Sequence, residues 1–236
     1  MKVFLISSER EVKRAANILK LKAIFCNIQN IEAIYPAFQK IPFKDKLITK
    51  ANKSIHRDLK LGELGCILSH RKAWLQIKND SNPDTAYLIL ESDAIVNDLG
   101  ILNENFEQIN QKFDIVFWGA FDGRTKLLKS KKYKLDGKYY FGQPLLNSLY
   151  CTYGYSLNKE AANYLLDNTK SLDLPVDYWK CRLKNSKLRI GAIVPELIST
   201  EGLQNSYIHT NKSKSVTRLF FDTVIDIKNS ILSFFR

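Results

Sequence analysis

Apolar residues follow two periods along this chain, and the changes between them predict its secondary structure. Short apolar runs at Lys2–Ile6 and near residues 23–28 indicate buried strands. Between them, residues 9–20 ("EREVKRAANILK") predict a helix. Four residues are expected on its inner face: Ala15, Ala16, Ile18 and Leu19. The order strand, helix, strand is typical of a parallel sheet with crossover helices.

Residues 61–79 ("LGELGCILSHRKAWLQIKN") carry the strongest helical pattern of the chain. Apolar residues at spacings near three and four are expected to share one side of this helix. They are Leu64, Ile67, Leu68, Trp74 and Leu75. A buried strand is predicted shortly afterwards, at Tyr87–Leu90.

The remaining elements are a helix at 104–112, a strand at 114–119, a strand running into a helix at 151–168, a helix from 174 and a strand at 188–197. Asn158 is predicted to cap one helix and Pro175 to occupy the first turn of the next. Residues 120–150 are interpreted as an irregular insertion. We expect an α/β fold with a mostly parallel central sheet flanked by helices, in one domain spanning residues 1–210.

Residues 211–236 predict a basic, amphipathic C-terminal helix. Its apolar side comprises Val216, Phe220, Val224, Ile227, Ile231 and Phe234. Its polar side comprises Arg218, Asp222, Asp226, Asn229 and Ser233. Two interpretations stay open: binding to an anionic membrane surface, helped by Lys212 and Lys214, or packing on the protein's own core or a dimer partner.

Composition adds an expected partner class and compartment. The 236 residues are 45% apolar with a net charge of +12, which indicates an ordered protein and an anionic partner. Nucleic acid, an anionic membrane and phosphorylated small molecules all fit, and so does a biased lysine content without any partner. The four cysteines form no C-x-x-C pair and are expected as buried free thiols in a reducing compartment. Without a signal-peptide pattern or a membrane-spanning run, a cytoplasmic location is expected.

Two carboxylates interrupt the most hydrophobic run of the first hundred residues, "LILESDAIV" at 88–96. Burial there is costly unless a positive group lies nearby. In an extended chain Glu91 and Asp93 project to the same side, where they could share one cation, while Ser92 points away. The predicted strand end is also where α/β sheets bind ligands, and such oxygen ligands suit Mg²⁺ or Mn²⁺. A solvated turn at the strand end is the alternative.

With these carboxylates in place, the chain resembles glycosyltransferase family 25, the lipooligosaccharide galactosyltransferases and their collagen-modifying relatives. The resemblance runs from the first strand to about residue 210. Six blocks occur in the family's order: "MKVFLISSER" followed by Arg14, "GELGCILSHRKAW", "YLILESDA", "DIVFWG", "TYGYSLNKEAANYLL" and "LPVDYW". One position departs from the family, which usually has Asp where this chain has Ser92.

The resemblance implies a GT-A type nucleotide-sugar-binding fold, a UDP-sugar donor, and Mn²⁺ or Mg²⁺ bridging Asp93 to the diphosphate. Glu91 is expected to bind the metal or the donor's ribose. An inverting transferase also needs a general base, for which the candidate is Asp177, a helix N-terminal carboxylate being the alternative. His209 is a candidate third metal ligand by analogy with other GT-A enzymes, or else a solvated loop residue.

Seven further positions are candidates for binding the donor or the acceptor sugar. Ser7, Arg10, Arg14 and Ser92 are assigned to the donor, and arginine suits phosphate because its donors form a fork. Ser69, His70 and Gly154 are assigned to the donor or acceptor sugar. The alternatives are solvated helix charges for the arginines, packing beneath the donor for Ser69 and His70, and a strand irregularity for Gly154.

The resemblance therefore implies an inverting β-galactosyltransferase that uses UDP-galactose and a lipooligosaccharide acceptor, located in the cytoplasm or on the inner membrane face. A catalytically silent relative that binds a nucleotide sugar or glycan is a second hypothesis, suggested by Ser92. A basic nucleic-acid-binding module is a third; only "KSKKYKLDGKYYF" (129–141) resembles its expected pattern, and we expect no nucleic-acid partner. The sequence leaves the sugar, the linkage and the oligomeric state open.

Overall fold

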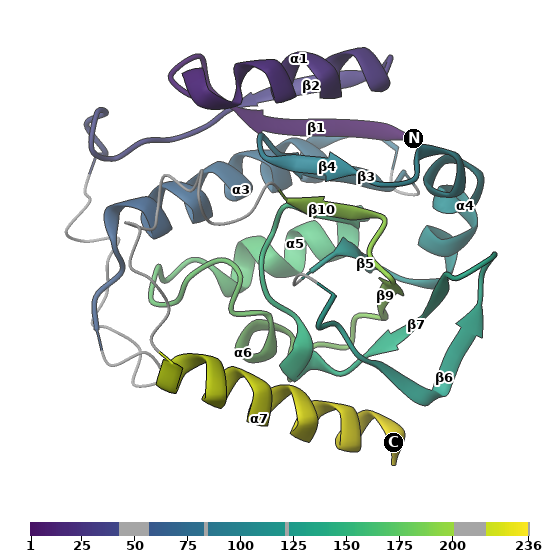
Figure 1. Ribbon diagram of the computed structural model, residues 1–236. Coiled ribbons are helices and arrows are strands. Elements are labelled where there is room, and N and C mark those ends of the chain that lie inside the picture. Colours follow the sequence, from purple (N-terminus) through teal and green to yellow (C-terminus); the bar gives the residue numbers. More distant parts are fainter. Residues whose placement is uncertain (43–56, 83–84, 121–122, 201–215, 236) are drawn as a thin grey trace.

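The computed structural model describes residues 1–42, 57–82, 85–120, 123–200 and 216–235, and only the backbone of residues 216–221. Helices cover both faces of a central sheet (Figure 1). The strands are β1 Lys2–Ser7, β2 Ile28–Glu32, β3 Tyr87–Glu91, β4 Ala94–Val96, β5 Ile115–Gly119, β6 Leu127–Lys134, β7 Tyr140–Pro144, β8 Gly154–Leu157, β9 Ile190–Val194 and β10 Ile198–Thr200. The helices are η1 Val12–Arg14, α1 Ala15–Ile24, α3 Leu61–Asn79, α4 Leu99–Lys112, η2 Leu146–Ser148, α5 Lys159–Asn168, α6 Trp179–Leu183 and α7 Val216–Phe234.

The sheet has eight strands in the order β2-β1-β3-β8-β5-β9-β7-β6, and β4 and β10 form a separate antiparallel pair. The pairs β1–β2, β1–β3 and β5–β9 are parallel, and the other four pairs are antiparallel. The α/β class is confirmed, but the sheet is mixed rather than mostly parallel. The reason is that the chain runs out to the edge hairpin β6–β7 and then returns to insert β8 at the centre.

Two hydrophobic cores lie on opposite faces of the sheet. Helices α3, α5 and α6 pack on one face, and α1 and α4 pack on the other. Tyr87 and Ile89 of β3 point into the first core, whereas Leu88 and Leu90 point into the second. A strand covered on both faces needs apolar residues at every position, which explains the uninterrupted run before Glu91.

The helix after β1 buries a different side from the one that was predicted. It opens with the 3-10 turn η1, and α1 then buries Leu21 while Ala15 and Ala16 are exposed and Leu19 is 68% exposed. Arg14 is buried in their place, so the expected inner face is wrong at these three residues, whereas Ile18 is partly buried against the second core as predicted. Periodicity could not reveal this because a charged residue occupies the inward position.

Helix α3 has the predicted bounds, but its buried side includes polar residues. Ser69 and His70 are buried, whereas Leu75, expected on the apolar side, is 50% exposed. The predicted cap of α5 is confirmed, since the Asn158 side chain accepts a hydrogen bond from the Ala161 amide.

Several smaller predictions need correction. Residues 120–150 are not irregular, since β6 and β7 extend the central sheet; whether they are an insertion stays a prediction. Helix α6 begins at Trp179, after a turn that contains Pro175, and the strand stopped by Pro195 is followed by β10. The four cysteines are free, but Cys26 and Cys181 are exposed rather than buried.

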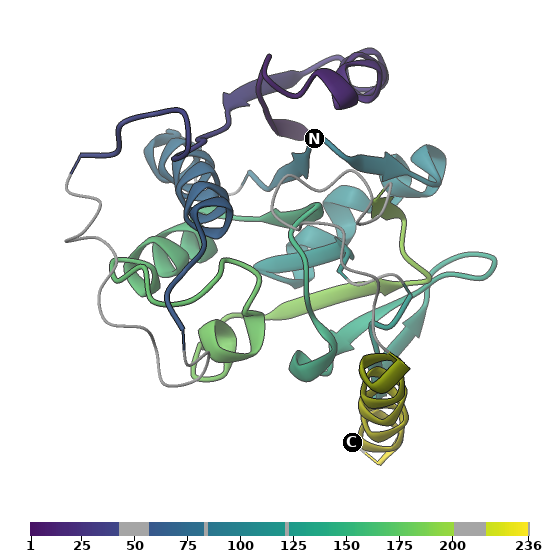
Figure 2. The same cartoon turned by 60° about the vertical axis from the view of Figure 1, so that its left-hand side comes forward.

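Helix α7 lies at the end of the molecule opposite α1 (Figures 1 and 2). Its amphipathic pattern is present, but Asp222, Asp226 and Asn229 face the protein, whereas the apolar side chains of Val224, Ile227, Ile231 and Phe234 are exposed. The expectation that an apolar side packs on the protein's own core is therefore wrong. Among the described residues, no helix is both long enough and apolar enough to cross a membrane.

A carboxylate at the start of β5 joins three elements of the sheet. Asp114 accepts hydrogen bonds from the Arg189 guanidinium at 2.7 Å, the Arg189 amide at 2.7 Å and the Asn158 side chain at 3.0 Å. Burial raises the pKa of Asp114, but the hydrogen bonds from Arg189 and Asn158 outweigh burial and hold the pKa below its ordinary value. The ionised form therefore stabilises the junction of β5, β9 and α5.

We expect Asp114→Asn to lower the free energy of unfolding by roughly 2 kcal/mol at pH 7, because charge-assisted hydrogen bonds are lost. The native pKa is depressed, so this stability is present above the unfolded pKa and is lost as the pH falls through the folded pKa. Urea titrations at several pH values should show the gap between the proteins closing below about pH 4. Asp167→Asn, which removes an exposed carboxylate paired with Lys170, is the control and should change little. A gap independent of pH would contradict the assignment.

Candidate functional site

A cavity of about 300 Å³ opens at the carboxyl ends of the parallel strands β1 and β3. Five chain segments line it: the end of β1, the η1 turn, residues 33–38 after β2, the first half of α3, and Glu91–Asp93. Ligands of α/β proteins bind beyond the carboxyl ends of parallel strands, so this cavity is the candidate site.

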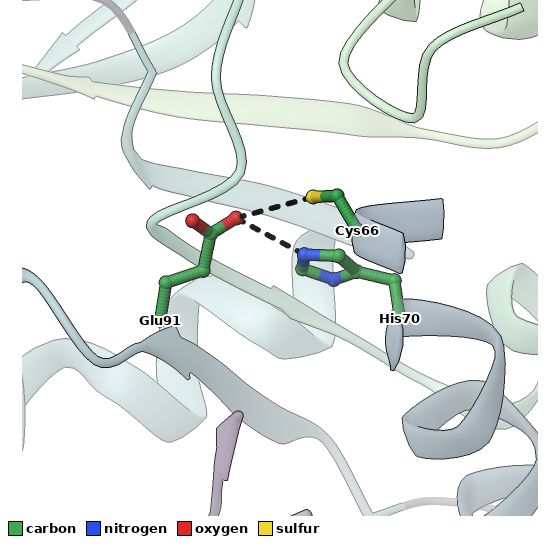
Figure 3. Close-up of side chains that lie close together, drawn as sticks. All are labelled: Cys66, His70 and Glu91. Carbon is green, nitrogen blue, oxygen red and sulfur yellow. Dashed lines mark hydrogen bonds and ion pairs between the residues drawn. The ribbon is translucent and has the colours of Figure 1, made fainter. Parts of the chain in front are cut away.

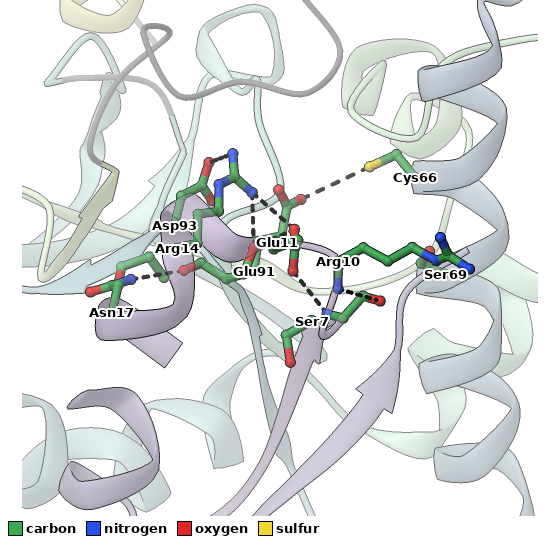
Figure 4. Close-up of polar contacts among 12 residues, drawn as sticks. Ser7, Arg10, Glu11, Arg14, Asn17, Cys66, Ser69, Glu91 and Asp93 are labelled. Atoms are coloured by element: carbon green, nitrogen blue, oxygen red, sulfur yellow. Dashed lines mark hydrogen bonds and ion pairs between the residues drawn. The ribbon is translucent and has the colours of Figure 1, made fainter. Parts of the chain in front are cut away.

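The Arg14 guanidinium organises one wall of the cavity (Figure 4). Its Nη1 donates to Ser92 Oγ at 2.8 Å, and its Nη2 donates to Asp93 Oδ2 at 2.7 Å. Ser92 Oγ in turn donates to Glu11 Oε1 at 2.8 Å, and Arg14 and Glu11 form an ion pair at 3.4 Å. All four side chains are buried, so each charge depends on its partners in this cluster.

Residues 92 and 93 form a turn between β3 and β4, not an extended segment. The amide group of Asn17 on α1 holds this turn by donating to the carbonyls of Ser92 at 2.8 Å and Ala94 at 3.0 Å. Glu91 consequently contacts α3 while Asp93 contacts Arg14. The prediction that Ser92 points away is wrong, because Ser92 joins Arg14 to Glu11.

The carboxylate of Glu91 is held from the opposite wall (Figure 3). His70 Nε2 lies 3.1 Å from Glu91 Oε1, and the Thr152 hydroxyl donates to the same oxygen. Trp74 Nε1 donates to the Tyr155 hydroxyl, which lies 2.8 Å from His70 Nδ1. An ionised carboxylate can only accept hydrogen bonds, so Nε2 of His70 carries the proton that is donated to Glu91.

This network keeps Glu91 ionised. Burial raises the pKa of the Glu91 carboxyl, but the hydrogen bonds from His70 and Thr152 and the charge of Arg14 bring the pKa below its ordinary value. Glu91 is therefore a weak base and a fixed negative charge at the cavity wall.

Cys66, His70 and Glu91 bring three potential metal-ligand atoms within 4.8 Å of one another. The protonated Nε2 points at Glu91, however, and burial together with the charges of Glu91 and Asp177 raises the pKa of the Cys66 thiol well above its ordinary value. A thiol binds metal as the thiolate. In this structure the three groups are joined by hydrogen bonding, since both Cys66 Sγ and His70 Nε2 contact Glu91 Oε1.

Asp93 offers a better cation ligand. Its Oδ1 is buried and has no hydrogen-bond partner among the residues that the structure describes. Burial, and then the charge of Glu91, raise the pKa of Asp93 to about 6 despite the opposing charge of Arg14. A buried carboxylate oxygen without a proton donor fits a hard divalent cation.

The other predicted sugar-binding residues have protein partners. The Ser69 hydroxyl donates to the Gly65 carbonyl and accepts from the Ile34 amide, and both ring nitrogens of His70 are engaged. Both residues line the cavity, so the geometry favours packing and positioning beneath a ligand. A Cβ on Gly154 would lie 2.5 Å from the Ile198 side chain, so the close approach at this glycine is to β10.

The remaining candidates lie around the cavity or outside the described residues. Ser7 is buried and donates to Asn30, and Arg10 lies over the Phe38 ring, with its guanidinium carbon 5.6 Å from the ring centre. Asp177 is half-buried in the turn before α6 and acts electrostatically on Cys66. His209 lies outside the described residues, so its assignment as a metal ligand stays a prediction.

Sequence reasoning missed Glu11, Thr152 and Tyr155. Glu11 could have been found by its spacing, because a carboxylate three residues before an arginine forms an ion pair on one helical turn. Thr152 and Tyr155 belong to a quoted family block, but their contacts depend on β8 inserting beside β3, which no local pattern shows.

The sequence was compared with protein families and with curated proteins. The model of "Glycosyltransferase family 25 (LPS biosynthesis protein)" matches residues 1–179. This range contains all six sequence blocks and every lining residue of the cavity. No curated protein matches the chain.

We expect Arg14→Lys to lower the free energy of unfolding by about 3–5 kcal/mol at pH 7, because one ammonium group cannot hold both Ser92 and Asp93 and leaves a buried charge without compensation. Urea unfolding of the wild type and the variant measures this loss of stability. Arg10→Lys is the matched control, since Arg10 is an exposed arginine of the same segment, and it should stay within about 0.5 kcal/mol. Equal losses in both variants would contradict the proposed role of Arg14.

We expect Ser92→Asp, which introduces the residue usual in the family, to destabilise this protein by about 2 kcal/mol more than the isosteric Ser92→Asn at pH 7.5. The aspartate would face Glu11 across a 2.8 Å contact in which serine donates a proton, whereas asparagine can still donate. The difference should shrink at pH 5, where one carboxyl of the pair binds a proton. Thermal unfolding at both pH values measures the difference in stability between the two variants. Equal stability of the two variants at pH 7.5 would contradict the expected repulsion between the introduced carboxylate and Glu11.

Proposed function

Because the chain belongs to glycosyltransferase family 25, we propose that it is a GT-A type, metal-dependent enzyme that transfers galactose from UDP-galactose to a lipooligosaccharide acceptor. The observation that carries this proposal is Oδ1 of buried Asp93, which has no hydrogen-bond partner in the described part of the chain and belongs to a residue lining the cavity at the carboxyl ends of β1 and β3. The family description supports the transferase class and lipopolysaccharide biosynthesis. The metal, the donor and the acceptor are our proposals.

In this proposal Asp93 holds Mn²⁺ or Mg²⁺ through Oδ1, and Arg14 orients the carboxylate by binding Oδ2. Such an ion stabilises the negative charge that develops on a departing diphosphate. Glu91 adds a fixed negative charge to the same cavity, which favours a cation there. His209 is a further candidate ligand.

The donor nucleotide is proposed to lie against the segment after β2. Tyr35, Pro36 and Phe38 line the cavity, and Phe38 is 70% exposed. An exposed aromatic ring suits stacking on a planar base, and the adjacent Arg10 guanidinium suits a phosphate or the base. The Ser7 hydroxyl donates to Asn30 and Ser92 Oγ is held between Arg14 and Glu11, so we propose that these serines support the donor indirectly.

The general base is proposed to be Asp177. Inversion requires a carboxylate that accepts the proton of the attacking acceptor hydroxyl. Glu91 is poorly suited because two hydrogen bonds lower its pKa, whereas half-buried Asp177 lies close enough to Cys66 to perturb its thiol. Asp177 would take the proton as the acceptor oxygen bonds to the sugar carbon and UDP leaves.

Ser92 supports one alternative, a relative that binds a nucleotide sugar without turning it over. The hydroxyl is committed to Glu11 and Arg14, so it adds no third carboxylate to the cavity. A nucleic-acid-binding module receives no comparable support, because the matched glycosyltransferase family includes the basic segment 129–141 within its range.

We expect the purified protein to release UDP from UDP-galactose when Mn²⁺ and a lactose- or heptose-type acceptor are present, and Asp93→Asn to lower the rate about 100-fold or more. Coupled detection of UDP across a panel of UDP-sugars measures donor and metal dependence together. Asp136→Asn, in an exposed turn, is the matched control and should keep full activity.

Calorimetric titration with UDP and Mn²⁺ separates the two hypotheses. Release from one donor that is lost in Asp93→Asn supports the transferase. Binding of UDP without release from any donor would replace it with the binding-only relative, and release independent of metal would contradict the role of Asp93.

A further inference from the structure

Helix α7 docks on the protein through its polar side. Asp222 pairs with Arg124 at 3.7 Å, and Asp226 pairs with Lys126 at 3.3 Å. One turn further on, Asn229 is buried and its amide contacts the Asn147 carbonyl at 3.5 Å. These three residues lie on one side of the helix, so charge and hydrogen bonding hold α7 against β6 and η2.

The opposite side of α7 is apolar and open. Six side chains on the described part of the helix and just after it are between 45% and 80% exposed: Val224, Ile225, Ile227, Ile231, Phe234 and Phe235. A helix on a water-facing surface normally has the reverse orientation, with its apolar side toward the core. Exposed Lys228 lies among these six side chains, and a gathering of exposed apolar side chains of this kind marks a binding site.

Lysines border this apolar surface. Lys129 of β6 lies over the ring of Phe234, with its ammonium nitrogen 3.8 Å from the ring centre. Along the same edge strand Lys131, Lys132 and Lys134 are exposed, and so is the ring of Tyr133. The apolar face of α7 and the basic strand β6 are therefore adjacent parts of one surface, at the end of the molecule opposite α1 (Figure 2).

We propose that α7 and β6 dock this protein on an anionic phospholipid bilayer, with the apolar face of α7 in the interface and the β6 lysines on the head groups. Apolar side chains beside a cluster of lysines match both components of such a surface. A second copy of the chain fits less well, because a face-to-face pair would bring two lysine clusters together. Membrane docking is inferred from this surface and does not depend on the proposed function. The proposed function is consistent with it, because a glycolipid acceptor lies in a bilayer.

Vesicle flotation with the full chain tests the proposal. The protein should bind vesicles of mixed phosphatidylcholine and phosphatidylglycerol, and bind phosphatidylcholine alone more weakly. Ile227→Ser with Ile231→Ser should reduce binding about tenfold or more. Leu19→Ser with Leu75→Ser, which removes two equally exposed apolar side chains from α1 and α3, is the matched control and should bind as the wild type does.

A lysine variant tests the electrostatic part. Lys129→Gln, at the lysine that lies beside Phe234, should weaken binding to the anionic vesicles about fivefold, since a lysine near the surface contributes about 1 kcal/mol. Added salt should act in the same direction. Circular dichroism of each variant verifies folding.

UDP release in solution, measured on the same variants, should be unchanged, which keeps this proposal separate from the catalytic one. Vesicle binding by a protein that releases no UDP would refute the transferase and leave membrane docking supported. Equal binding by the wild type and the isoleucine variant, or no binding to anionic vesicles, would overturn the docking. So would a dimer in sedimentation that the isoleucine variant abolishes without any effect of vesicles.

Discussion

A single buried guanidinium sets the geometry of the cavity. Arg14 comes from the start of the first helical segment, and its partners Ser92 and Asp93 come from the turn after β3, nearly eighty residues later. Burying Glu11 and Asp93 without Arg14 would leave two carboxylates uncompensated in a poorly solvated place. The η1 turn, the kink after β3 and the cavity wall between them are therefore mutually dependent.

The second wall depends on a chain of hydrogen bonds that begins in the core. The Trp74 indole and the Tyr155 hydroxyl are fully buried, and through His70 they determine where Glu91 lies. A charge at the cavity is thus positioned by the packing of α3 against β8. Changes in this part of the core alter the electrostatics of the site without touching a ligand.

Local patterns were sufficient for some elements and insufficient for others. The bounds of α3 and the cap of α5 follow from short-range rules, and the apolar run of β3 follows from burial on both faces. The inward direction of Arg14 could not be predicted, because only the carboxylates of a distant turn make a buried arginine stable. The orientation of α7 could not be predicted for a similar reason. Periodicity identifies two sides of a helix, but here ion pairs with Arg124 and Lys126 decide which side faces the protein.

Within the candidate site, the position of the carboxylates was predictable and the turn that separates them was not.

The position of β9 has a consequence for how the chain acquires its fold during synthesis. Residues 190–194 fill the gap between β5 and the β7–β6 hairpin, although they follow the part of the chain that the family model matches. Until these residues leave the ribosome, β5 and β7 present unpaired edges, and the hairpin has no neighbour to join it to the sheet. The nascent chain therefore carries two exposed sheet edges while residues 145–190 are synthesised, a period in which chaperones would protect it from aggregation.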